Sequence, residues 1–352
     1  MTSIETIDLR PDYRISRVIR GGWQLAGGHG AVDRNQAVAD LAAAAEAGII
    51  TFDCADIYTG VEELIGRFRT TYARQHGSEA ANRIKVHTKC VPDLDLLPKI
   101  SKRDVRAIVD ESLRRLRQER LDLVQFHWWD YGIPGCVEAA LWLDELRREG
   151  KIDLLGGTNF DTDHVERFAA AGVPMVSMQV QYSLLDRRPE HGFIEACRRH
   201  DIRLLCYGSV AGGFLSERWL DLPEPQAPLE NRSLTKYKLI IDDFGGWPLF
   251  QALLQTLRRI AGRHGVDIAT IASRYILDRP QVAAVIVGAR NRRHLAANAD
   301  IGSVRLTEQD RAEIAAPLAR STGPAGDVFA LERDRSGRHG AIMKYNLNAK
   351  AS

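Results

Sequence analysis

Short runs of apolar residues alternate with longer amphipathic segments along almost the whole chain. The apolar runs have the character of buried strands and lie at residues 16–20, 50–54, 84–90, 121–127, 152–157, 175–180, 203–208 and 283–287. The segments between them repeat apolar residues at spacings of three and four, which predicts helices at 33–48, 61–75, 102–119, 135–149, 161–171 and 189–200. The pattern therefore predicts a repeated strand–helix unit.

Helix-end signals agree with this pattern at two places. Ser101 precedes Asp104 at the spacing of a capping box, and Gly150 follows the segment 135–149 at the position where glycine commonly ends a helix. Eight buried-type strands, each followed by a helix, favour an α/β fold of the (β/α)8 TIM-barrel type over an open sheet.

A doubly wound Rossmann sheet is the alternative fold, because residues 21–30 (GGWQLAGGHG) are rich in glycine. This stretch contains no G-x-G-x-x-G, since the run that begins at Gly28 reaches Asp33 without a third glycine. The barrel is therefore the preferred prediction.

Two segments interrupt the strand–helix rhythm. Residues 221–248, after the seventh strand, are rich in Pro, Asp and Gly and too long for a plain loop, so they are predicted to be an insertion. Helical patterns follow at 249–264 and 267–278. The tail, 323–352, is polar but ends in apolar residues (Ile342, Met343, Tyr345, Leu347), so docking over the barrel mouth is favoured over partial disorder.

The bulk composition narrows the class of protein. A chain of 352 residues fits a single barrel domain, with its core at about 12–320. A formal net charge of +2 gives no reason to expect nucleic acid or an anionic membrane as a partner. The start lacks a signal-peptide pattern, and no apolar run is long enough to span a bilayer, so we expect a cytoplasmic protein. Five scattered cysteines are expected to be reduced thiols in the core (Cys54, Cys90, Cys136, Cys197, Cys206).

Polar residues close three neighbouring predicted strands. Asp53 ends the second strand, Lys89 the third and His127 the fourth, and Tyr58 follows Asp53 by five residues. The carboxyl ends of barrel strands converge on one site, and buried charges need partners there. The Lys89 ammonium next to Tyr58 is expected to lower the pKa of the phenol from its reference value near 10, making Tyr58 a general acid.

His127 would then donate a hydrogen bond to a carbonyl oxygen and share its developing charge, and no metal is required. Each residue also has a structural explanation: a helix cap or ion-pair partner for Asp53, a counter-ion for Lys89, a loop aromatic for Tyr58, a core imidazole for His127. Their joint position at successive strand ends favours the catalytic interpretation.

The segment 48–68 (GIITFDCADIYTGVEELIGRF) resembles the signature of the aldo-keto reductase superfamily. Further similar blocks follow in the family's order through residue 300: HTKC at 87–90, LDLVQFHW at 121–128, GGTNF at 156–160, Gln179 with Tyr182, LLCYGSVAGGFLS at 204–216 and VIVGARNRRHLAANAD at 285–300. The resemblance implies a (β/α)8 barrel and hydride exchange between a nicotinamide cofactor and a carbonyl or alcohol. Its catalytic tetrad falls on Asp53, Tyr58, Lys89 and His127.

The resemblance also implies cofactor contacts. Thr158, Asn159 and Gln179 match the positions that hold the nicotinamide carboxamide, and Tyr207 matches the aromatic residue on which the nicotinamide ring stacks. The positions around the pyrophosphate fall on Gly208, Val210, Gly213 and Arg218. Beyond Gly288, the adenosine and its phosphate would be met by Arg290, His294 and Asn298. The guanidinium of Arg290 suits a 2′-phosphate, which favours NADP (NADPH) over NAD, although NAD stays possible because His294 and Ala297 depart from the family's usual residues.

Aromatic residues are predicted at the rim of the site. Trp23 follows the first strand, and Trp128, Trp129 and Tyr131 follow the fourth. Aromatic walls suit sugars, aryl aldehydes and ring lactones alike, so these residues select neither a substrate nor a direction of reaction.

Two other functions are compatible with a barrel. A cofactor-binding regulatory or interaction protein, similar to the β subunits of potassium channels, would retain the same tetrad with little turnover. A metal-dependent hydrolase would need His, Asp or Glu residues paired at ligand spacing at the strand ends, and the sequence shows no such pairing.

Overall fold

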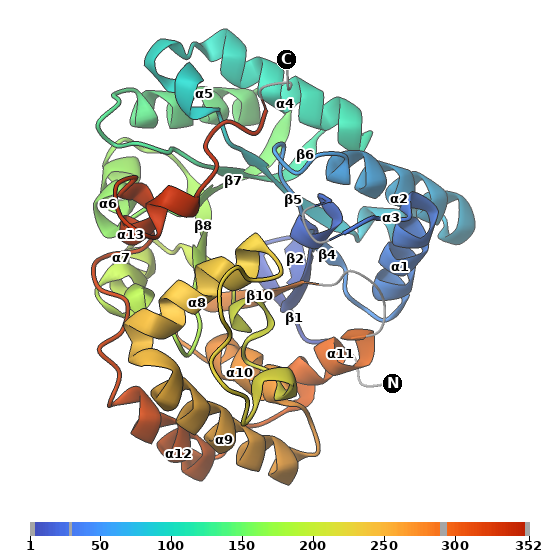
Figure 1. Ribbon diagram of the computed structural model, residues 1–352. Coiled ribbons are helices and arrows are strands. Elements are labelled where there is room, and N and C mark those ends of the chain that lie inside the picture. Colours follow the sequence, from blue (N-terminus) through green and yellow to red (C-terminus); the bar gives the residue numbers. More distant parts are fainter. Residues whose placement is uncertain (1–3, 28–29, 289–293, 349–352) are drawn as a thin grey trace.

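The computed structural model describes residues 4–27, 30–288 and 294–348 (Figure 1). Eight parallel strands form a closed barrel in the order β10-β3-β4-β5-β6-β7-β8-β9. They are β3 (Val18–Gly21), β4 (Thr51–Asp53), β5 (Lys85–Cys90), β6 (Leu121–Phe126), β7 (Ile152–Thr158), β8 (Met175–Gln181), β9 (Arg203–Tyr207) and β10 (Val282–Gly288). The predicted (β/α)8 barrel is confirmed, with strand ends within a few residues of those expected.

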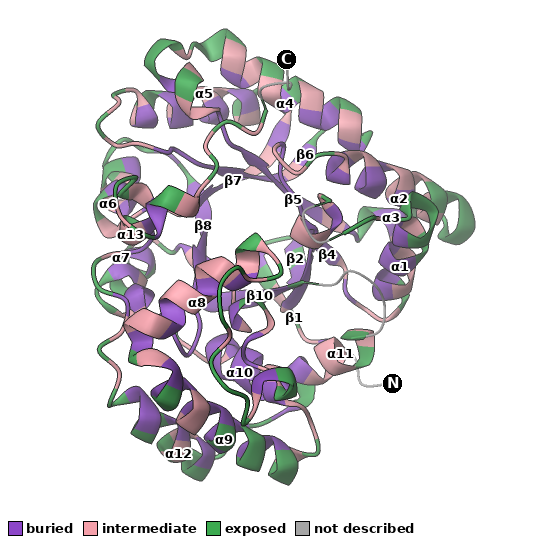
Figure 2. Cartoon of the chain, viewed as in Figure 1, coloured by how far each residue is buried: buried purple, intermediate pink, exposed green. Residues whose placement is uncertain are grey.

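Helices surround the barrel (Figure 1). They are α1 (Arg34–Glu46), α2 (Val61–His76), α3 (Ser78–Asn82), α4 (Lys102–Leu116), α5 (Cys136–Arg148), α6 (Thr162–Ala170), α7 (Phe193–Arg199), α8 (Arg232–Phe244), α9 (Gly246–His264), α10 (Ile268–Leu277), α11 (Leu295–Ser303), α12 (Glu308–Leu318) and α13 (Ala330–Arg333). The apolar faces of helices such as α4, α5 and α10 pack on the strands, so the barrel wall is almost entirely buried (Figure 2). Both predicted helix-end signals are confirmed: the capping box joins Ser101 and Asp104, and Gly150 follows α5 with φ +85°.

A hairpin that the apolar pattern did not predict closes one end of the barrel. β1 (Thr6–Arg10) and β2 (Tyr13–Ser16) pair antiparallel, so Ser16, expected to begin the first barrel strand, instead ends β2. Hairpin residues Leu9, Tyr13 and Ile15 are buried against side chains of the barrel strands. This packing fills the end of the barrel opposite the site.

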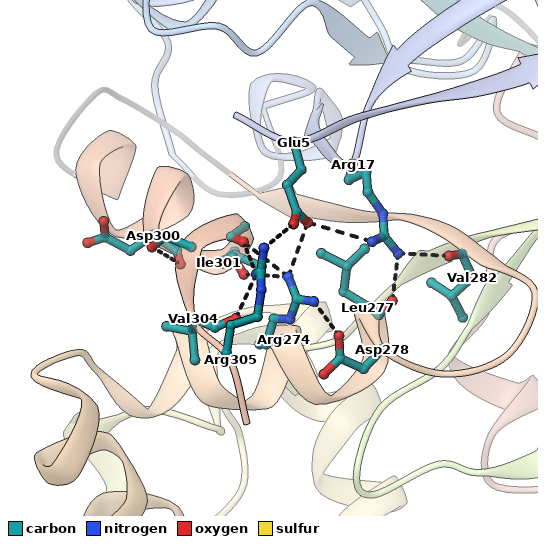
Figure 3. Close-up of polar contacts among 12 residues, drawn as sticks. Glu5, Arg17, Arg274, Leu277, Asp278, Val282, Asp300, Ile301, Val304 and Arg305 are labelled. Atoms are coloured by element: carbon teal, nitrogen blue, oxygen red, sulfur yellow. Dashed lines mark hydrogen bonds and ion pairs between the residues drawn. The ribbon is translucent and has the colours of Figure 1, made fainter. Parts of the chain in front are cut away.

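A polar network fixes the start of the chain to the last strand–helix unit (Figure 3). Glu5 accepts hydrogen bonds from Arg274 of α10 at 3.1 Å and from Arg305 at 2.7 Å. Arg17 donates to the carbonyl oxygen of Leu277 at 2.8 Å. Each carboxylate oxygen of Glu5 thus has a cationic partner. These contacts join the segment before β1 to α10 and to the segment after α11.

The predicted insertion, 221–248, is not irregular throughout. Residues 232–244 form α8, capped at its start by the side chain of Asn231, and α9 already begins at Gly246. A helix forms here because buried residues recur at helical spacing (Leu234, Tyr237, Ile240, Ile241, Phe244).

The C-terminal tail docks on the barrel, as favoured from the sequence. The backbone amide of Leu94 donates to the carbonyl of Tyr345 at 3.0 Å, and the amides of Leu347 and Asn348 donate to Asp93 at 2.9 Å. All five cysteines are free and buried, as predicted. Among the described helices, none has the length and apolar character needed to cross a membrane.

Candidate active site

The barrel register brings the predicted polar residues to one level at the mouth. Asp53 of β4 pairs with Gly21 of β3, Lys89 of β5 pairs with Gln125 of β6, and Thr158 of β7 pairs with Gln179 of β8. Because parallel strands all end on the same face, their last side chains surround one cavity of about 760 Å³. Asp53, Tyr58, Lys89 and His127 all line it.

A buried ion pair lies at the centre of this set. The Lys89 ammonium is 2.7 Å from Asp53 Oδ1 and donates to the carbonyl of Cys54 at 2.7 Å. It also lies 5.1 Å from the centroid of the Tyr58 ring. The ammonium therefore has two short acceptors, and its positive charge also lies over the ring of Tyr58.

The second oxygen of Asp53 is held by two amides. Gln125 donates to Oδ2 at 3.0 Å and Gln179 donates to it at 2.6 Å. The Gln179 amide nitrogen also donates to Gln125 Oε1 at 3.0 Å. A ligand reaching Gln179, which was predicted to hold a nicotinamide carboxamide, would therefore meet its carbonyl oxygen.

Burial controls the acid–base character of Tyr58 and Lys89. Burial raises the pKa of the Tyr58 phenol, and the Lys89 charge opposes this shift without reversing it. The expected net lowering of the phenol pKa is therefore wrong, although the contribution of Lys89 has the expected sign. Burial lowers the pKa of Lys89, but Asp53 and Tyr58 outweigh burial, so that pKa lies above its ordinary value.

His127 is a neutral imidazole held between two strand ends. Its Nδ1 lies 3.0 Å from the carbonyl oxygen of Thr158, and because a carbonyl only accepts, Nδ1 carries the proton. Burial, with a smaller contribution from Arg333, lowers the His127 pKa to about 3. Nε2 has no hydrogen-bond partner among the described residues, and in this tautomer it accepts rather than donates. The predicted donation to a carbonyl oxygen needs the other tautomer.

The predicted cofactor residues line the same cavity. At one end the Tyr207 hydroxyl donates to Asn159 Oδ1 at 2.8 Å, beside Thr158 and Gln179. The turn after β9 needs glycine: Gly208 has φ +76°, and a Cβ there would lie 2.3 Å from the Tyr237 hydroxyl. The remaining lining residues among those predicted are Val210, Gly213, Arg218, Gly288, His294 and Asn298. Arg290 lies outside the described residues.

The amide and hydroxyl groups beside an aromatic ring fit a nicotinamide, and the glycine-containing turn lets a backbone approach a pyrophosphate. These features support a nicotinamide dinucleotide as the ligand of the cavity. No group of three or more His, Cys, Asp or Glu residues within the described ranges is placed to hold a metal ion.

Only two of the four predicted aromatic residues reach the cavity. Trp23 and Trp129 line it. Trp128 is fully buried and donates to the carbonyls of Asp130 and Ile133 at 3.0 and 3.1 Å. Tyr131 stacks on His164 with ring centroids 3.5 Å apart. The placement of Trp128 and Tyr131 at the rim is therefore wrong, because their rings complete the packing of the loop after β6.

Several lining residues were not predicted from the sequence. Helix α8 contributes Lys236 and Tyr237, and the tail contributes Phe329, Ile342 and Leu347. The apolar residues at the end of the tail predicted that it docks on the barrel, but they did not predict which of its side chains line the cavity. Nothing in the predicted insertion, 221–248, indicated that a helix would bring a lysine into the cavity.

Comparisons with known proteins agree on one family. The model of the Aldo/keto reductase family matches residues 17–318. The chain is 26% identical to "Aldo-keto reductase YhdN" of Bacillus subtilis (strain 168), covering 89% of this chain and 93% of that protein. It is 25% identical to "NADH-specific methylglyoxal reductase" of Escherichia coli (strain K12), covering 85% and 93%. The solved structure of the glycerol dehydrogenase AKR11B4 from Gluconobacter oxydans superposes with a TM-score of 0.74 at 25% identity, covering 92% of this chain and 98% of that one.

Proposed function

Because the chain belongs to the aldo/keto reductase family, we propose that it transfers a hydride between NADP(H) and a carbonyl/alcohol pair, the carbonyl being an aldehyde, a ketone or a sugar. The observation that carries this proposal is the Lys89–Asp53 ion pair, at 2.7 Å, with Tyr58 above the ammonium in the wall of the cavity. A buried cation next to a phenol stabilises the phenolate that remains when the phenol gives up its proton, which suits Tyr58 to acid–base catalysis at a substrate oxygen.

The cofactor would be held along the length of the cavity. Thr158, Asn159 and the Gln179 carbonyl oxygen would bind the carboxamide, and Tyr207 would stack on the nicotinamide ring. The turn at Gly208, Val210 and Gly213, with Arg218, would surround the pyrophosphate. Gly288, Arg290, His294 and Asn298 would lie at the adenosine end, where the Arg290 guanidinium favours the 2′-phosphate of NADP. Bound in this way, the cofactor supplies or accepts the hydride.

The side chains then act on the substrate oxygen. Since burial raises the Tyr58 pKa, the phenol stays protonated at neutral pH and can donate its proton to a carbonyl oxygen during reduction. Lys89 stabilises the phenolate left behind, and Asp53 keeps the ammonium in place. In the tautomer that Thr158 selects, His127 Nε2 can accept a hydrogen bond from a substrate hydroxyl.

Replacing Tyr58 by Phe tests this proposal. The Tyr58→Phe variant keeps the ring and its packing but removes the proton donor, so turnover of a carbonyl panel with NADPH should fall by at least about a hundredfold. Cofactor affinity, measured by fluorescence titration, should stay within about twofold. Undiminished turnover in the variant would rule out Tyr58 as the general acid.

A further inference from the structure

The wall of the cavity contains a largely buried cation that the proposed chemistry does not use. The Lys236 ammonium of α8 lies 5.3 Å from the centroid of the Tyr207 ring and 5.7 Å from those of the Tyr237 and Phe329 rings. Its side chain is only 16% exposed. Aromatic faces stabilise an ammonium, but they do not provide the hydrogen-bond acceptors that it loses on leaving water.

The nearest carboxylate pairs mainly with another residue. Lys236 Nζ is 3.7 Å from Glu332 Oε1, which is longer than a hydrogen bond. The two oxygens of Glu332 already accept from the Arg188 guanidinium at 2.9 and 3.1 Å. Burial lowers the pKa of Lys236, and Glu332 opposes that shift only in part. Among the described residues, the ammonium therefore has a carboxylate nearby but no acceptor within hydrogen-bond distance.

Lys236 lies at the reacting end of the cavity. Tyr207, under the ammonium, is the ring on which the nicotinamide would stack. Phe329, also under it, packs edge-on against His127 with ring centroids 5.8 Å apart. A substrate bound between Tyr207 and His127 would therefore have Lys236 beside it.

The charges of the described residues that line the cavity favour an anion. Arg232 and Lys344 line the cavity as well. The acidic lining residues among those described already have partners: Asp53 binds Lys89, Glu217 accepts from the amide of Ile268 at 2.8 Å, and Asp267 caps α10.

We propose that Lys236 binds a carboxylate of the substrate and so selects aldehydes or ketones that carry a negative charge. A carboxylate beside the ammonium would supply the short acceptor that Glu332 does not. This role rests on the proposed function and adds the class of substrate to it.

Two aldehydes that differ in charge test the role of Lys236. The kcat/KM of the wild type should be at least about tenfold higher for 4-carboxybenzaldehyde than for its neutral ester, methyl 4-formylbenzoate. The Lys236→Met variant should lose this preference by lowering kcat/KM for the carboxylate, with the ester affected by no more than about twofold. Lys236→Arg should retain part of the preference.

Lys238→Met is the matched control. Lys238 lies two residues further along α8, outside the cavity lining, and its ammonium pairs with Glu224 and Asp242 at 2.6 Å. Its removal should leave the preference for the carboxylate unchanged. Equal kcat/KM values for both aldehydes in the wild type, or an unchanged preference in Lys236→Met, would overturn the role of Lys236.

Calorimetric titration with 4-carboxybenzaldehyde in the absence of cofactor separates this role from catalysis. Binding should weaken about tenfold or more in Lys236→Met and stay unchanged in Lys238→Met. If no member of a panel of aldehydes, ketones and sugars that includes these two aldehydes is reduced with NADPH or NADH, the proposed function fails, while the titration still decides whether Lys236 binds the carboxylate.

Discussion

At the scale of single residues, opposing electrostatic effects define the chemistry of Tyr58. Burial favours the neutral phenol, and the Lys89 ammonium favours the phenolate. Because burial is the larger effect, the phenol remains an acid at neutral pH while its conjugate base still has a cation beside it. Asp53 makes this possible by holding Lys89 at 2.7 Å, with Gln125 and Gln179 satisfying its other oxygen.

This balance predicts the pH dependence of the two reaction directions. Since the Tyr58 pKa is raised above its usual value of about 10, the kcat/KM for reduction should be flat through neutral pH and fall only in the alkaline range. Oxidation of an alcohol needs the phenolate, so its kcat/KM should rise over that same alkaline range.

Lys89→Met is the informative variant for the pH profile. Without the ammonium the phenolate loses its stabilising charge, so the alkaline limb of both profiles should move to still higher pH and both rates should fall. Reduction that declines between pH 6 and 8 in the wild type would show that a group other than Tyr58 supplies the proton.

At the scale of elements, α8 and the C-terminal tail meet over the barrel mouth (Figure 1). Arg232 donates to the carbonyl of Ile342 at 2.8 Å, and His339 lies 2.7 Å from Asp243. The tail is also anchored to the strand ends, because Arg333 donates to the carbonyls of Trp129 at 2.8 Å and Asn159 at 2.7 Å. Trp129 and Asn159 belong to the loops after β6 and β7, which lie beside His127. The tail therefore supports the site as well as covering it.

Replacing Arg333 by Met should therefore affect both the stability of the protein and the pKa of His127. The loop carbonyls would lose their donors, which should lower the free energy of unfolding in urea by about 1–3 kcal/mol. Removing the nearby positive charge should also raise the pKa of His127 above about 3, measured by NMR titration of the imidazole.

Arg335→Met provides the control for the Arg333 variant. Arg335 is largely exposed and pairs with Asp130 at 3.0 Å on the surface, so its loss should change the unfolding free energy by less than about 1 kcal/mol. If the two substitutions lowered the free energy of unfolding equally, the contacts of Arg333 with the loop carbonyls would stabilise the protein no more than a surface ion pair does.

At the scale of the whole molecule, the barrel could be predicted because its strands are buried on both faces. Apolar runs such as 283–287 are then continuous, and the order of the strands along the chain is their order in the barrel. The site could be predicted for the same reason, because parallel strands in a barrel all end on one face. Asp53, Lys89 and His127 therefore line one cavity.

Features that depend on contacts distant in sequence could not be predicted in this way. Trp128 and Trp129 are adjacent in a loop, and only the packing of that loop decides which ring reaches the cavity. Lys236 enters the site because α8 lies over the mouth, within a segment that the sequence identified only as an insertion. The tautomer of His127 depends on the carbonyl of Thr158, which no side-chain pattern reveals.

The most direct test of the proposed hydride transfer is a stopped-flow experiment on the wild-type protein loaded with NADPH and mixed with a panel of aldehydes, ketones and sugars. We predict oxidation of NADPH over repeated turnovers with at least one carbonyl, and slower turnover with NADH. Tight retention of unoxidised NADPH with every carbonyl would instead identify a cofactor-binding protein without reductase activity.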